Sequence, residues 1–306
     1  MTVAGRARRR VSPRTRRQII IGLLYILPSF VLMMTFNVIP IFLSAFFSFT
    51  KYNMASPPEW IGLDNYARLF TNRVLTESLS NTVRYVLITV PAQTVLSLLI
   101  AVFIAEHMKT RYGSLMRSVI FIPVIVSLIA SATVWNIMYQ PKGGLINQLL
   151  EFLGAQPVNF LGKKASALPS VAVVAIWKGT GYYMVIYYAG VMNIPTDVRE
   201  AAIVDGATPV QRFFHITLPL LRPILIYVLI TSLIGGLQMF DVPQILTNGT
   251  GDPARSSMTL IMYLNRHLFS KNYGLGGALS VMLFIITGIL SLIVFRFNSS
   301  STKSKH

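Results

Sequence analysis

The chain has 306 residues, of which 53% are hydrophobic and 12% charged, and its mean hydropathy is +0.59. Soluble domains carry about 25% charged residues, so this composition excludes an ordinary water-soluble domain and indicates a membrane protein. The absence of cysteine excludes disulfides, iron–sulfur clusters and cysteine nucleophiles. The formal net charge of +17 comes mainly from an N-terminal arm and from residues that flank apolar stretches, so we expect no nucleic acid partner.

Residues 1–18 form a basic arm, and we expect it to remain unfolded beside anionic lipid headgroups. Its arginines are Arg6, Arg8, Arg9, Arg10, Arg14, Arg16 and Arg17. The uncharged run that follows, Ile19–Thr50, is far longer than the apolar core of a cleaved signal peptide. It therefore predicts a first membrane span.

Six apolar stretches each approach the ~20 residues that a helix needs to cross hydrocarbon. They cover residues 19–49, 82–105, 118–139, 168–192, 223–240 and 275–295. The runs are continuously apolar rather than alternating, which favours helices over a barrel. The sequence therefore predicts an all-α membrane protein with six transmembrane helices. Pro28 or Pro40 could bend the first helix, and Pro123 lies inside the third.

An even number of spans places both chain ends on the same side of the membrane. Lys and Arg are concentrated in the arm, beside the predicted inner loops and in the tail at 296–306. The positive-inside rule therefore predicts cytoplasmic N- and C-termini, and the bias depends mainly on the arm. Residues 50–74 are then an extracytoplasmic loop, and residues 75–295 are the core transmembrane domain.

A polar segment at 195–219 separates the fourth and fifth predicted spans, and it is patterned as two short helices joined by a turn. Asp197 is a candidate N-cap of the first helix, with Glu200 as its capping-box partner. Gly206 is expected to end that helix in a left-handed conformation. Thr208 then caps a second helix, which Pro219 is expected to close.

This segment matches the pattern E-A-A-x3-G-x9-I-x-L-P at every fixed position. Those positions are Glu200, Ala201, Ala202, Gly206, Ile216, Leu218 and Pro219. The segment resembles the cytoplasmic coupling loop of permease subunits of binding-protein-dependent type I ABC importers. The resemblance implies a helix-turn-helix that docks in a groove of an ATPase subunit, with Glu200 offering a charge and Asp205 also in the coupling set.

Two outer loops resemble those of the carbohydrate-importing branch of this family, which includes maltose and glycerol-phosphate systems. Residues 57–66 contain the G-L-x-N-Y core. Residues 246–253 are similar to an L-T-x-G-G-P turn, but Thr250 stands where the second glycine is common. The resemblance implies a bacterial or archaeal cytoplasmic membrane protein. It also implies a second permease subunit, two ATPase subunits and an extracytoplasmic solute-binding protein as partners.

The sequence contains no pattern for catalysis. There is no G-x-x-x-x-G-K-[ST] nucleotide loop, no H-E-x-x-H motif, and no metal-ligand spacing among the four histidines. We therefore expect no catalytic residue, metal or cofactor, and the energy must come from another chain unless the solute moves passively. A secondary carrier or channel for a small polar solute is the alternative, although carriers usually contain internal repeats and none is convincing here.

Lys178 is the clearest ionisable residue inside a predicted span, and it either contacts solute or snorkels toward the outer interface. Gly179 beside it could admit a ligand or allow close helix packing. In maltose-type permeases, a glycine and a tyrosine before the coupling loop and amides after it contact sugar. The resemblance assigns these roles to Gly179, Tyr182 and Gln238, while Met239 replaces the second amide.

Overall fold

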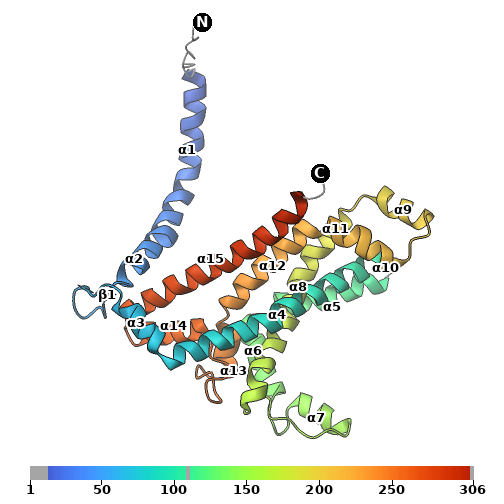
Figure 1. The fold of residues 1–306 in the computed structure, drawn as a ribbon. Coiled ribbons are helices and arrows are strands. Elements are labelled where there is room, and N and C mark those ends of the chain that lie inside the picture. The colour runs from blue at the N-terminus through green and yellow to red at the C-terminus, as the bar shows by residue number, and fades with distance from the viewer. Residues whose placement is uncertain (1–12, 108–110, 304–306) are drawn as a thin grey trace.

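The computed structural model describes residues 13–107 and 111–303, and nearly all of its regular structure is helical (Figure 1). The predicted helical class is confirmed. The N-terminal arm departs from expectation where it is described, because α1 (Pro13–Met33) includes Arg14, Arg16 and Arg17. Proline suits the first position of a helix, so the apolar helix extends backward through these arginines. The rest of the arm lies outside the described residues.

The first span is α1, a π-helical turn η1 (Met34–Val38) and α2 (Ile39–Phe47). Pro28 lies inside α1 without ending it. The irregular turn instead comes directly before Pro40, whose missing N–H cannot complete the regular bond to the preceding turn. The loop after this span contains β1 (Thr50–Lys51), which pairs antiparallel with β2 (Glu59–Trp60). Helix α3 (Asp64–Thr71) follows.

Two long helices, α4 (Arg73–Glu106) and α8 (Lys164–Met192), pack against each other along the centre of the molecule. Their shared core includes the fully buried side chains of Tyr85, Val171 and Val174. Helix α12 (Arg222–Leu237) packs on both of them, and α15 (Tyr273–Lys303) packs on α12 and α2. Short helices α7 (Leu145–Phe152), α13 (Asp241–Leu246) and α14 (Leu260–Phe269) complete one end of the bundle (Figure 1).

The third predicted span is broken rather than continuous. Helix α5 (Arg111–Ile125) and helix α6 (Leu128–Met138) meet at an angle of 99°. Ser127, between them, has an extended backbone with φ −51° and ψ 138°. Pro123 removes one backbone bond from the last turn of α5, which weakens the helix where it stops. A single straight helix over 118–139 was therefore the wrong prediction.

Four described helices are long and apolar enough to cross a membrane, and the bent pair raises the number to five. The four are Arg14–Phe47, Arg73–Glu106, Arg222–Leu246 and Tyr273–Arg296. Helix α8 has the length, with 29 residues, but it is not among them. Its central Lys178, two glycines and several tyrosines reduce its apolarity.

The polar segment between α8 and α12 is a helical hairpin at one end of the bundle (Figure 1). It contains α9 (Thr196–Val204), α10 (Pro209–Arg212), a π-helical turn η2 (Phe213–Thr217) and α11 (Leu218–Leu220). The C-terminal end of α15 lies on the same side of the molecule as this hairpin.

Candidate functional site

The first hairpin helix ends in the backbone motif that its sequence predicts. Gly206 has φ +76°, in the left-handed region that glycine enters without steric penalty. The N–H of Gly206 donates to the Ile203 carbonyl at 3.0 Å, and the N–H of Ala207 donates to the Ala202 carbonyl at 2.9 Å. These two bonds form a Schellman motif, so the predicted stop at Gly206 is confirmed.

The start of the same helix differs from the prediction. Pro195 occupies the N-cap position with an extended backbone, and no side chain caps the helix. Asp197 therefore lies inside the first turn, and the expected capping box with Glu200 does not form. Because the extended Pro195 is the N-cap, the helix begins at Thr196, one residue before the predicted N-cap Asp197. Asp197 still places a carboxylate near the positive end of the helix.

The second hairpin helix begins with the predicted capping box. The N–H of Gln211 donates to Thr208 Oγ1 at 3.3 Å, and the N–H of Thr208 donates to Gln211 Oε1 at 2.8 Å. Pro219 does not close this helix, contrary to expectation, because helical turns continue through α11 to the start of α12. The π turn η2 lies just before Pro219 and accommodates its missing N–H.

The hairpin residues assigned to coupling divide between its inner and outer surfaces. Ala202 is buried, and Ile216 and Leu218 are half-buried, so these three side chains pack within the chain. The outward group is exposed and consists of Glu200, Ala201, Asp205, Gly206 and Pro219. Two apolar side chains join this outer surface, with Val204 86% and Val210 65% exposed. An exposed apolar surface with a carboxylate is suited to contact with another protein.

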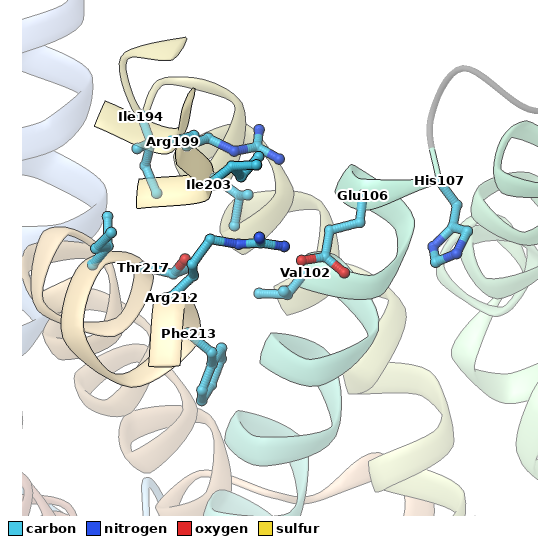
Figure 2. A pocket seen from close by; sticks show the side chains of 11 residues that line it. Val102, Glu106, His107, Ile194, Arg199, Ile203, Arg212, Phe213 and Thr217 are labelled. Carbon is cyan, nitrogen blue, oxygen red and sulfur yellow. The ribbon is translucent and has the colours of Figure 1, made fainter. Parts of the chain in front are cut away.

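A cavity of about 300 Å³ lies between the hairpin and the end of α4. Figure 2 shows the Glu106 carboxylate and the side chains of Arg199 and Arg212 reaching into the space between these elements. Arg212 Nη1 also donates to the Ala207 carbonyl at 3.4 Å, directly after the Gly206 turn. Sequence analysis missed this cavity, because Glu106 lies 93 positions away from Arg199 along the chain.

A second cavity, of about 290 Å³, lies in the middle of the bundle and is called the central cavity below. It brings together three of the four predicted solute-contacting residues, Lys178, Gly179 and Tyr182, all on α8. The remaining lining comes from α4, α8, the broken helix, α12 and the start of α13: Tyr85, Thr89, Gln93, Val124, Leu128, Ala175, Tyr183, Ser232, Gly235, Gly236, Met239 and Val242. Tyrosine, hydroxyl and amide groups give this mainly apolar cavity the means to bind hydroxylated molecules.

The fourth predicted residue, Gln238, lies elsewhere. It lines a cavity of about 430 Å³ bordered by α12, α14 and α15, while its neighbour Met239 lines the central cavity. Helix α12 ends at Leu237, and Gln238 is its C-cap. Because the chain leaves helical geometry at this point, helical spacing no longer tells which residue faces the cavity.

Gln93 is a lining residue that sequence analysis missed. Its Nε2 donates to the Ala175 carbonyl at 2.8 Å. A Cβ placed on Gly179 would approach Gln93 Nε2 to 2.5 Å and Cδ to 2.8 Å, so the glycine leaves room for this amide. Tyr85, Thr89 and Gln93 recur at four-residue intervals in an apolar helix, which places them on one face. That four-residue spacing was the sequence feature from which Gln93 could have been identified as a lining residue.

Lys178 has its own partners within the chain. Its Nζ donates to the Pro123 carbonyl at 2.8 Å and to the Val126 carbonyl at 2.6 Å. Pro123 lies in the last turn of α5 and Val126 directly follows this helix, at the break in the third predicted span. The side chain is therefore directed across to a neighbouring helix end. Within the described residues, no three His, Asp or Glu side chains are grouped so as to hold a metal ion.

Comparisons of this chain with known families, sequences and structures agree with one another. The family described as "Binding-protein-dependent transport system inner membrane component" matches residues 66–303. A trehalose/maltose transport system permease protein, MalF, of Thermococcus litoralis is 34% identical over 92% of this chain and 94% of its own length. A probable ABC transporter permease protein, YurN, of Bacillus subtilis is 33% identical over 91% of this chain and 96% of its own. A chain from a crystal structure of a bacterial alginate-importing ABC transporter has the same fold, with a TM-score of 0.82 at 23% identity, covering 93% of this chain and 96% of that one.

Proposed function

Because the chain belongs to the family of binding-protein-dependent transport system inner membrane components, we propose that it forms the membrane pathway of an ATP-driven importer for a sugar or sugar-like solute. The observation that carries this proposal is the near full-length similarity to a trehalose/maltose permease. A lactose transport system permease protein, LacF, of Rhizobium radiobacter adds support, at 31% identity over 90% of this chain. Family membership argues against the secondary carrier considered from the sequence alone.

The proposed topology has six spans, in which α5 and α6 together form the third and α8 forms the fourth. Both chain ends and the hairpin are then cytoplasmic. The C-terminal end of α15 lies on the hairpin's side of the bundle (Figure 1), as this arrangement requires. Helix α1, whose large apolar side chains are exposed, contacts lipid or the second permease subunit.

The hairpin is proposed to dock in a groove of an ATPase subunit. Glu200 and the exposed apolar side chains of Val204 and Val210 form the contact surface, while the buried Ala202 anchors the hairpin to its own chain. The Schellman motif at Gly206 and the capping box at Thr208 give the hairpin a defined shape. Closure of two ATPase subunits on ATP would then move the hairpin as a rigid unit.

The central cavity is proposed to be this subunit's share of the solute pathway. Tyr182 is 48% exposed and presents a ring face suited to the apolar face of a sugar ring. Gln93, Ser232 and the cavity tyrosines supply hydrogen-bonding groups for hydroxyls. A second permease subunit would complete the pathway, and an extracytoplasmic binding protein would deliver the solute.

Reconstitution tests the proposal. The chain is co-purified with its partner permease, ATPase and binding protein, placed in liposomes, and supplied with radiolabelled maltose, trehalose and lactose. We expect uptake of at least one sugar that requires ATP on the ATPase side and the loaded binding protein. ATPase subunits lacking the nucleotide-loop lysine are the matched control. Uptake driven by an ion gradient without ATP would instead establish a secondary carrier.

A further inference from the structure

The Lys178 side chain forms hydrogen bonds with backbone carbonyls at the end of a broken helix. Helix α5 stops at Ile125, and α6 leaves at 99°, so the carbonyls of the last turn of α5 have no following helical turn to bond. Nζ donates to two of the carbonyls at this end, those of Pro123 and Val126. An ammonium at a helix C-terminus also interacts favourably with the negative end of the helix dipole.

We propose that Lys178 is a positioning residue that holds the broken third span against α8 and thereby shapes the central cavity. Val124 and Leu128 lie on either side of the break, and both line the cavity together with Lys178. The side chain therefore connects α8, which forms one wall of the cavity, to the broken third span, which forms another. Its partners are backbone carbonyls, so the contact depends on the donor groups of Lys178 and on no other side chain's identity.

This arrangement also defines the chemistry of the solute, and this step rests on the proposed function. Lys178 is the only Lys, Arg, His, Asp or Glu that lines the central cavity in the described chain. An ammonium with free donors there would favour an anionic solute, but two of the three donors of this one are already used by carbonyls at a helix C-terminus. The other polar lining groups are neutral amide and hydroxyl groups. This half of the pathway therefore accepts an uncharged, hydroxylated solute.

The wall-fixing role is tested by measuring the bend. The native chain has no cysteine, so spin labels can be attached at Val119→Cys on α5 and Ile137→Cys on α6, whose side chains are 54% and 55% exposed. Electron-electron resonance in the purified complex, or in the chain alone in detergent, gives their distance distribution. Lys178→Met should lengthen or broaden it, and Lys178→Arg should restore it. An unchanged distribution in Lys178→Met would overturn the proposal.

A second experiment tests whether the Lys178 ammonium can still attract an anion into the central cavity, and it does not require the solute to be known. Gly235 lines the central cavity, and a Cβ there meets no atom within 4 Å, so Gly235→Cys places a thiol in the cavity. The reaction rates of a sulfonate and a trimethylammonium methanethiosulfonate reagent are compared with and without Lys178→Gln, whose shorter amide keeps donor groups and helps the fold. If the Lys178 ammonium were free to interact with molecules in the cavity, removing it would change the ratio of the two reaction rates by roughly tenfold or more. We expect a smaller change, and a tenfold fall in the anionic preference would overturn the neutral-solute inference.

The two measurements remain separate from the proposed function. If the reconstituted complex takes up no sugar, the proposed function fails while the bend distances still report on Lys178. If uptake works and Lys178→Met shows an unaltered bend, the positioning role fails alone. If Lys178→Met does not accumulate in the membrane, Lys178→Leu, which also lacks donor groups, replaces it in the bend measurement.

Discussion

The N–H of Ala207 donates to the carbonyl of Ala202 at 2.9 Å across a left-handed Gly206, and this bond fixes where the first hairpin helix ends. Ala202 is also buried within the chain. The same residue thus anchors the hairpin to its own chain and accepts the bond that shapes its turn.

Gly206→Val should disable coupling. A Cβ at Gly206 meets nothing within 4 Å, so the penalty comes from the backbone at φ +76° and amounts to about 1–2 kcal/mol, with a β-branched residue at the upper end. We expect lost uptake in reconstituted complexes. The ATPase subunits should detach or hydrolyse ATP without responding to the loaded binding protein.

Two variants control this experiment. Gly206→Asn should retain more activity, because asparagine tolerates the left-handed region better than other residues with a side chain. Gly22→Val also adds a side chain in open space, but at a helical glycine without a positive φ, and should leave uptake intact. Normal ATP-driven uptake by the Gly206→Val complex would contradict the coupling role of the turn.

Gly179→Ala should displace Gln93 and narrow the central cavity. The added Cβ would come within 2.8 Å of Gln93 Cδ, so the amide must move and lose its bond to the Ala175 carbonyl. A lost hydrogen bond costs about 0.5–1.5 kcal/mol, which corresponds to a roughly 2- to 12-fold weaker apparent affinity for solute. Transport kinetics at matched membrane levels of the complex provide the measurement.

The double variant Gly179→Ala with Gln93→Ala makes the prediction sharper. Shortening Gln93 removes the clash that Gly179→Ala creates, so the two substitutions should combine to less than the sum of their separate effects. Additive losses would show that the two residues do not act through their contact.

Single cysteines test the proposed orientation of the chain ends. Ser301→Cys lies near the C-terminal end of α15, and Asn248→Cys follows α13 at the other end of the bundle. An impermeant thiol reagent applied to intact cells should label Asn248→Cys and leave Ser301→Cys unlabelled, with permeabilised cells as the positive control. Labelling of Ser301→Cys in intact cells would reverse the topology.

The hairpin was predictable because its signals are local. Gly206, Thr208 and Gln211 act through bonds to residues within five positions of themselves, so their spacing in the sequence is enough. Asp197, predicted as a helix start, and Pro219, predicted as a helix end, were assigned wrongly because each prediction assumed that one local signal overrides its neighbours. Pro195 had already set the helix start, and a π turn absorbed the effect of Pro219.

The central cavity was predictable only where helical periodicity holds. Gly179 and Tyr182 were assigned by resemblance to maltose-type permeases, and Lys178 lies one turn before Tyr182 on the same continuous helix, so all three line the cavity. Gln238 lies at the end of α12, where that periodicity stops, and the cavity position belongs to Met239. At the break near Ser127, Lys178 of another helix donates to the Pro123 and Val126 carbonyls, a long-range contact that the local sequence of the third span does not contain.

Tyr182→Ala tests the solute pathway most directly. Tyr182 lines the central cavity and is 48% exposed, with its ring 5.2 Å from that of Tyr183 in an edge-on arrangement. The substitution removes a hydroxyl, at about 0.5–1.5 kcal/mol, and a ring contact of similar size. Apparent uptake should therefore weaken roughly 5- to 100-fold.

The matched control is Tyr227→Ala, which removes a similarly exposed tyrosine of α12 that is not among the residues lining the central cavity. Assembly with the ATPase subunits should be unchanged in both variants, because the hairpin lies at one end of the bundle (Figure 1) and contributes no lining residue to the central cavity. Tyr227→Ala should transport normally. Wild-type uptake kinetics in Tyr182→Ala at matched complex levels would remove this ring from the pathway and leave it a role in helix packing alone.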